Sequence, residues 1–447
     1  MKRMSWNFSV NHGINDQKST IALVTELLVY INTRTHVLNN PALYMQSSME
    51  SKEESKEDPD LDDSIEYIIH RQNSTVPAVR DLPVSLETAL THDLSSWKIF
   101  KWAMQRAFSK PLVEAASVPA KLNRNYREDP VKYAHYGVSE ERRSIVVNWT
   151  LSKDETDALV RVCHSNNVTV TSALSAANLS VTSLFLQMGN NEEFISQNLK
   201  AYITVDTRCH GINPYMRVQD PDTVSITSKT IDMNTNIKPL TDWTDGQVAC
   251  ASHCVDFITP VPLSTITHAK DVFDFESNQD PNKQPVKSEN PEFWVLAKQC
   301  RAVTKDKVEN ELDVGILFFE FLIDEIGLLG IIDTPASVND PLKMGRDSPC
   351  GVSNVGVADF KGLDSRSGSG PGSGSGIYED RVSVKEAYFG SGGGRGGSYC
   401  FLSCQTVNGC LNNSLHFATP ITTMEEAILF KKCFITILKE IISAEIK

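Results

Sequence analysis

His12 and Asp16 have the residue types and the spacing that could transfer protons in a reaction. They form an HxxxD sequence, His12-Gly-Ile-Asn-Asp16. An imidazole with a pKa near neutrality can take a proton from a reacting group and return it later as a general acid. The spacing is weak evidence alone, since somewhat under one chance match is expected from ten histidines and the aspartate content of the chain. The alternatives are a structural histidine and a helix N-terminal aspartate that the helix dipole favours.

The elements around this pair are those that would let a side chain project into a cleft. Residues 6–11 alternate apolar and polar and predict a short strand, and residues 12–19 are polar and turn-like. Residues 20–31 carry apolar side chains at helical spacing. The pair therefore lies in a loop that leaves a strand and enters a helix.

Strands and helices are predicted to alternate through the rest of the chain. Ser152 and Glu155 form a capping box at the start of a helix, and Asn408-Gly409 is a strong hairpin turn signal. The expected helices are 86–108, 153–164, 172–188, 293–308, 312–329 and 422–442, and the expected strands are 144–151, 200–205, 352–360, 399–406 and 413–417. This pattern predicts an α/β fold class.

Composition and charge exclude several classes of protein. The 447 residues carry a net charge of −13, which argues against a general nucleic-acid binder and gives no support for docking on an anionic membrane. Residues 50–63 hold eight of the acids within an acidic insertion spanning 40–73. The most apolar stretch, 314–332, contains three acidic residues and predicts core, not a transmembrane segment. The start of the chain lacks a signal-peptide pattern, so we expect a cytoplasmic, intracellular protein.

Cysteine and glycine usage give no sign of a metal site or a phosphate cradle. Ten cysteines without zinc-finger spacing predict buried or partly exposed free thiols. Glycines cluster at 365–376 and 390–397, and neither tract matches a nucleotide-binding signature. We interpret both tracts as loops or linkers.

The sequence resembles the CoA-dependent acyltransferase superfamily, which includes BAHD enzymes, condensation domains and fungal alcohol acetyltransferases. SVNHGINDQKSTIALVTELLVY, residues 9–30, resembles the central HxxxD motif of the superfamily. Four further pieces follow in the family's order: Leu82-Pro-Val-Ser-Leu-Glu87, TVTSALSAA at 169–177, Val205-Asp-Thr-Arg208, and Pro349-Cys-Gly-Val-Ser-Asn-Val-Gly356 ahead of Asp359-Phe360. The last piece is similar to the alcohol-acetyltransferase form of the loop that BAHD enzymes fill with DFGWG.

This resemblance implies a fold, a reaction and roles for particular residues. The fold is a two-domain, chloramphenicol acetyltransferase-like mixed-sheet architecture, with residues 1–135 and 136–447 as the two subdomains. The reaction is transfer of an acyl group, acetyl in the first instance, from acyl-CoA to an alcohol, with His12 as general base and no metal. Asp16 pairs with Arg208 to hold the motif, while Gln17, Ser353, Asn354 and Gly356 belong to the substrate tunnel or its loops.

Two departures from the family pattern leave alternative functions possible for this protein. Gln17 stands where the family has glycine, and only eleven residues precede His12, so we expect an N-terminally shortened, incomplete first domain. The alternatives are an amine N-acyltransferase and a truncated, non-catalytic acyltransferase-like binding protein. The expected partners are a small-molecule alcohol or amine, with no nucleic acid, and the expected state is a monomer.

Overall fold

A computed structural model describes residues 143–190, 197–206, 252–278, 291–310, 346–358, 384–390, 397–419 and 421–443, with Phe100, Lys101, Met104 and Phe108. The chain divides into two compact units. Nearly all of the described residues belong to the unit formed by 86–213, 251–359 and 385–447. The boundary at 135/136, the acidic insertion, the 365–376 tract and the expected helix at 312–329 lie outside the described residues and stay predictions.

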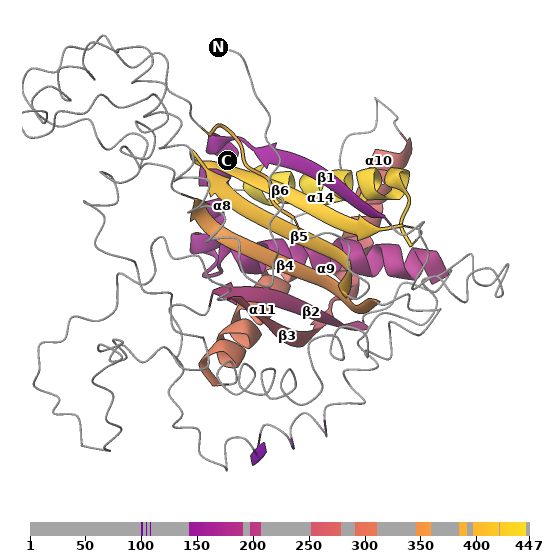
Figure 1. The fold of residues 1–447 in the computed structure, drawn as a ribbon. Helices are drawn as coiled ribbons and strands as arrows, with labels where there is room; N and C mark the ends of the chain where they lie inside the picture. The colour runs from indigo at the N-terminus through magenta and orange to yellow at the C-terminus, as the bar shows by residue number, and fades with distance from the viewer. Residues whose placement is uncertain are drawn as a thin grey trace, which may run out of the picture. The chain divides into compact units, whose positions relative to one another are not determined.

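Six strands form one mixed sheet in the order β1-β6-β5-β4-β2-β3 (Figure 1). The central pairs β4 with β5 and β2 with β4 are parallel, while the outer pairs are antiparallel. The strands are β1 (Ser144–Leu151), β2 (Gln197–Asp206), β3 (Ser252–Val261), β4 (Arg346–Ala358), β5 (Gly397–Val407) and β6 (Cys410–Ala418). The α/β class with a mixed sheet, expected from the sequence, is confirmed.

Helices pack against one face of this sheet, which we call the helix face (Figure 1). They are α8 (Lys153–Ser165), α9 (Val170–Asn190), α10 (Leu263–Asn278), α11 (Pro291–Asn310) and α14 (Met424–Ser443). In β1 the buried positions alternate with more exposed ones, so its buried apolar side chains point to the helices. Aromatic rings pack between the sheet and the helices. The ring centroids of Trp149 in β1 and Phe434 in α14 are 5.5 Å apart, and those of Phe417 in β6 and Phe430 in α14 are 5.2 Å apart.

Helix α9 runs through the middle of the core. Its side chains from 172 to 187 are all buried, as expected of a helix that other elements surround. Its polar groups are bonded locally: the Ser175 hydroxyl donates to the Thr171 carbonyl at 2.8 Å, and the Asn178 amide donates to the Gly351 carbonyl of β4 at 3.3 Å. These bonds reduce the cost of placing polar side chains in the core.

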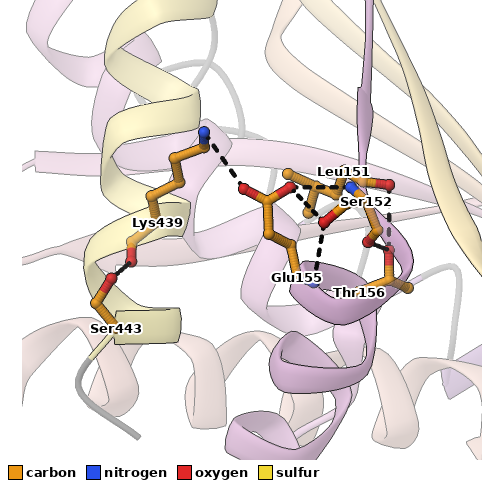
Figure 2. A network of polar contacts seen from close by, with 6 residues as sticks. All are labelled: Leu151, Ser152, Glu155, Thr156, Lys439 and Ser443. Atoms are coloured by element: carbon orange, nitrogen blue, oxygen red, sulfur yellow. Dashed lines mark hydrogen bonds and ion pairs between the residues drawn. The ribbon is translucent and has the colours of Figure 1, made fainter. Parts of the chain in front are cut away.

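The capping box predicted at the start of α8 is present (Figure 2). The Glu155 carboxylate accepts from the Ser152 backbone N–H at 2.9 Å, and the Ser152 hydroxyl accepts from the Glu155 N–H at 3.2 Å. The Ser152 N–H lowers the pKa of Glu155, and Lys439 of α14, 3.3 Å away, adds to the effect. The cap therefore also ties α8 to the last helix.

The β5–β6 hairpin also forms at the predicted turn. Asn408 and Gly409 both have positive φ angles, 51° and 80°, which a two-residue turn of this hand requires. By contrast, β3 and α10 were not anticipated. Pro260 lies within β3, which is tolerated because β3 is at the sheet edge, and α10 mixes β-branched residues with aspartates, which weakens its helical pattern.

No single helix among the described residues is long and apolar enough to cross a membrane. One bent pair, Lys153–Ser165 with Val170–Met188, meets the length and composition criteria together at an angle of 95°.

Candidate functional site

The carboxyl ends of the parallel strands β2 and β4 bring two distant sequence segments together. The strands pair in register at Ala201 with Cys350 and Ile203 with Val352. One step further, the Thr204 hydroxyl donates to the Ser353 hydroxyl at 2.6 Å, although the two residues are 149 positions apart. Ligands of open α/β sheets commonly bind at the carboxyl ends of parallel strands. This edge is therefore a candidate binding site.

Strand β4 has an irregularity just beyond Ser353. The pairing of β4 with β5 is irregular between Asn354 and Val357, and Gly356 has a φ of 83°, a conformation that favours glycine. The Asn354 side chain stabilises this irregularity, because its carbonyl accepts from the Gly356 N–H and its amide donates to the Thr171 hydroxyl, both at 3.0 Å. Asn354 thus joins the bulge to the first turn of α9.

The structure places some of the predicted site residues and not others. Ser353, Asn354 and Gly356 lie together at the edge just described. Strand β2 ends at Asp206, two positions before Arg208. His12, Asp16, Gln17 and Arg208 lie outside the described residues, so their roles and their pairing stay predictions.

A second group of polar side chains was missed by the sequence analysis. Ser403 and Gln405 of β5 and His416 of β6 point to the face of the sheet away from the helices. Each is at least 94% buried: Ser403 is 1% exposed, Gln405 3% and His416 6%. The sequence signal for this group is the polar residues at every second position in 403–405 and 412–416, a pattern that the sequence analysis uses only to predict hairpin strands.

Residues 384–390 lie against this group. The Gln405 amide donates to the Ala387 carbonyl at 2.8 Å, and the Tyr388 and Thr150 hydroxyls share a hydrogen bond of 2.5 Å. Gly390 lies so close to the His416 ring that a methyl group there would overlap it. Burial lowers the pKa of His416 to about 4, and the Phe389 backbone opposes this shift. His416 is therefore neutral at physiological pH.

The Tyr202 hydroxyl and several buried thiols among the described residues are also uncharged. Tyr202 of β2 stacks on Phe401 of β5 with centroids 5.7 Å apart, and burial raises the pKa of Tyr202. Burial raises the pKa of Cys300 to about 12 and that of Cys350 and Cys404 as well. Protonated thiols are poor nucleophiles and poor metal ligands. Within the part of the chain that is described, no group of three or more His, Cys, Asp or Glu side chains could hold a metal ion.

Comparison with known proteins gives matches only among solved structures. No protein-family model matches the chain, and no curated protein matches it significantly. The SgcC5 protein of Streptomyces globisporus aligns over 97% of this chain and 67% of its own, at 12% identity and a TM-score of 0.41. The PapA2 acyl transferase aligns over 97% and 64%, at 12% identity and a TM-score of 0.39.

A third solved structure is the TRI3 trichothecene 15-O-acetyltransferase of Fusarium sporotrichioides. It aligns over 72% of this chain and 52% of its own, at 10% identity and a TM-score of 0.36. The chain therefore spans about half to two thirds of the length of the solved proteins it matches.

Proposed function

We propose that this chain is a CoA-dependent acyltransferase that moves an acyl group, acetyl in the first instance, from acyl-CoA to an alcohol. One observation carries the proposal beyond the sequence resemblance. Strand β2, which leads into the piece that resembles the strand-end arginine segment, pairs in parallel with β4, which contains the piece that resembles the superfamily's loop. The Thr204–Ser353 hydrogen bond joins the two strands. Segments that match one family in order and also meet in space support a common ancestry better than either fact alone.

The proposed chemistry needs one well-placed base. A thioester carbonyl is already electrophilic, and CoA thiolate is a good leaving group, so no covalent enzyme nucleophile is required. His12 takes the proton from the acceptor hydroxyl as its oxygen attacks the carbonyl. The tetrahedral intermediate then collapses, the carbon–sulfur bond breaks, and His12 returns the proton to the departing sulfur. Hydrogen-bond donors aimed at the oxyanion would lower the barrier further.

Asp16 and Arg208 are proposed to position the base and not to touch the substrate. Arg208 is the second residue after β2, which ends at Asp206. An ion pair between Asp16 and Arg208 would hold the HxxxD loop, and with it the His12 ring, in place. The double variant should lose much less than the sum of the two single losses, because both residues serve one interaction.

The test measures CoA thiol release from acetyl-CoA with panels of alcohols and amines. We expect alcohol-dependent release that His12→Ala lowers roughly 10²–10⁴-fold while the melting temperature is unchanged. His164→Ala is the control, because His164 is an exposed histidine on α8. Release only with amines would replace the alcohol with an amine acceptor. No acceptor-dependent release, or full turnover by folded His12→Ala, would refute the catalytic assignment.

A further inference from the structure

Residues 384–390 lie on the face of the sheet away from the helices and form neither helix nor strand. We call these seven residues the strap. One end of the strap is fixed to the sheet by two hydrogen bonds. The Gln405 amide of β5 donates to the Ala387 carbonyl at 2.8 Å, and the Tyr388 hydroxyl bonds to the Thr150 hydroxyl of β1 at 2.5 Å. The strap is therefore bound to both sides of β6.

The other end of the strap covers the ring of His416. Gly390 packs so closely on this ring that a methyl group in place of its hydrogen would overlap it. Gln405 and Thr150 are both register partners of Asn412, and His416 is four positions further along β6. The two ends of the strap are therefore roughly 13 Å apart on the sheet. The strap runs along β6 between them as an extended segment.

The strap can leave the sheet without moving the strands. The Gly/Ser-rich tracts 365–376 and 390–397 are on either side of it in the sequence, which predicts linkers there. Strand β4 ends at Ala358, before the first tract, and β5 begins at Gly397, where the second tract ends. Segments that are attached by a few contacts and not by a strand ladder open at a lower free-energy cost than the core does.

His416 is the group beneath the strap that acid changes. The ring is 6% exposed, and its burial lowers the pKa of His416 to about 4. A protonated ring needs water or an anion beside it, because a charge that is buried without either is costly. The contact with Gly390 leaves no room for water on that side of the ring. Release of the strap would open that side to water.

Within the described part of the chain, no ionised group replaces water as a partner for a protonated His416. The residues opposite it are Phe401 in β5 and Val146 in β1, and neither of them ionises. The strap contacts the ring through Gly390 and the Phe389 backbone. The pKa of His416 has no contribution from the ionisable side chains of the strap, which are Lys385, Glu386 and Tyr388.

We propose that residues 384–390 are an acid-sensitive strap, which lies on the sheet while His416 is neutral and is released when His416 takes up a proton, with the six-stranded core still folded. The contacts of Gly390 with the ring couple the proton to the strap. The hydrogen bonds of Ala387 and Tyr388 keep the strap in place at neutral pH. This device is independent of the proposed acyl transfer.

The two states of the ring set the size of the acid effect. The pKa of His416 is about 4 beneath the strap, and it returns to an ordinary value near 6.5 when water reaches the ring. The open form therefore binds the proton more tightly, and acid favours it. Linkage between these two pKa values makes the equilibrium constant for opening about 20-fold larger at pH 5 than at pH 7.

Limited proteolysis of the full chain with thermolysin measures the opening. Thermolysin cleaves before large apolar residues, so the Tyr388–Phe389 bond is a site within the strap that becomes accessible on release. The cleavage rate is divided by that of a synthetic peptide of residues 380–394 at the same pH, which removes the pH dependence of the protease. We expect this ratio to rise about 20-fold from pH 7 to pH 5, with an unchanged far-ultraviolet circular dichroism spectrum.

Four variants assign the effect to the ring and to the strap. His416→Leu and His416→Gln do not titrate, so we expect their ratio to change less than about twofold over this range. His164→Ala is the matched control, because His164 is exposed on α8, and it should keep the rise of about 20-fold. Tyr388→Phe loses the bond to Thr150, so its ratio should be about fivefold higher than the wild type at both pH values.

Three results would overturn the strap. They are a ratio that does not rise in acid, an equal rise in both His416 variants, or cleavage within β6 and α14 at the same rate as within the strap. The third result would show that acid unfolds the whole core. Since no turnover is measured, a chain without acyl transfer can still show the release. Failure of the release leaves the proposed function unaffected.

Discussion

Acid should destabilise this protein through His416 in a pH range that lies above the titration of most carboxylates. Burial lowers the pKa of His416 from an ordinary 6.5 to about 4 in the folded chain. The unfolded chain takes up a proton near pH 6.5, whereas the folded chain does so only near pH 4. The unfolded state therefore binds more protons between these values, and the stability that the neutral ring provides is lost as pH falls from 6.5 to 4.

The size of this loss of stability follows from the difference between the pKa of His416 in the folded and in the unfolded chain. Integrating the proton uptake of one group gives about 2 kcal/mol of lost unfolding free energy between pH 7 and pH 5. The full loss, below pH 4, is about 3 kcal/mol. The ring is 6% exposed, so solvent screens the effect only slightly. Glu155, whose pKa is lowered, loses its contribution only as pH falls below its ordinary range near 4.5.

Urea unfolding of the wild type and of His416→Leu at pH 7.0, 6.0 and 5.0 measures the effect. Leucine has a similar volume and does not titrate, so the variant should lose about 2 kcal/mol less than the wild type over this range. His164→Ala is the control for removal of a histidine, because His164 is exposed. Parallel pH dependences of the wild type and His416→Leu would show that the ring is hydrated or charged in the folded state, and the argument would be wrong.

Four further outcomes follow from the fold. Ser152→Ala should lower the unfolding free energy by about 1 kcal/mol, measured in urea, because the α8 cap is lost. Gly409→Ala should cost about 1 kcal/mol or more in the same assay, since the φ of 80° disfavours any side chain; an unchanged midpoint would contradict the turn geometry. Phe430→Ala should cost about 3–5 kcal/mol by calorimetry, because this ring is fully buried between Phe417 and Phe185. Deletion of residues 51–63 should leave the melting temperature nearly unchanged, because so polar a run has few apolar groups to bury, and a large drop would place it against the body.

Local signals in the sequence were sufficient for most of the described elements. The Ser152–Glu155 capping box and the Asn408-Gly409 turn were read correctly, because each depends on backbone groups within a few residues. The helices at 291–310 and 424–443 were also expected, within a few residues at each end. Strand β3 was missed, because an edge strand tolerates a proline and needs only one apolar face.

The residues of the candidate site were likewise predicted from the sequence only in part. The sequence selected Ser353, Asn354 and Gly356 by resemblance, and it selected His12, Asp16, Gln17 and Arg208 on grounds that the described residues do not test. It did not indicate that Thr204 and Ser353 are bonded, because 149 residues separate them and only the parallel pairing of β2 with β4 brings them together.

The sequence by itself determined the α/β class, the caps and turns, and the residues that resemble an acyltransferase motif. These properties follow from local spacing, so they can be read along the chain. Only the tertiary structure decided which polar residues share a face and which lack a partner. In the sequence, Ser353 and Ser403 are two serines in apolar strands. In the sheet they are register partners: the Ser353 hydroxyl is bonded to Thr204, and the Ser403 hydroxyl has no partner among the described residues. The reason is physical: hydrogen bonding and burial are set by neighbours distant in sequence, and strand pairing chooses those neighbours.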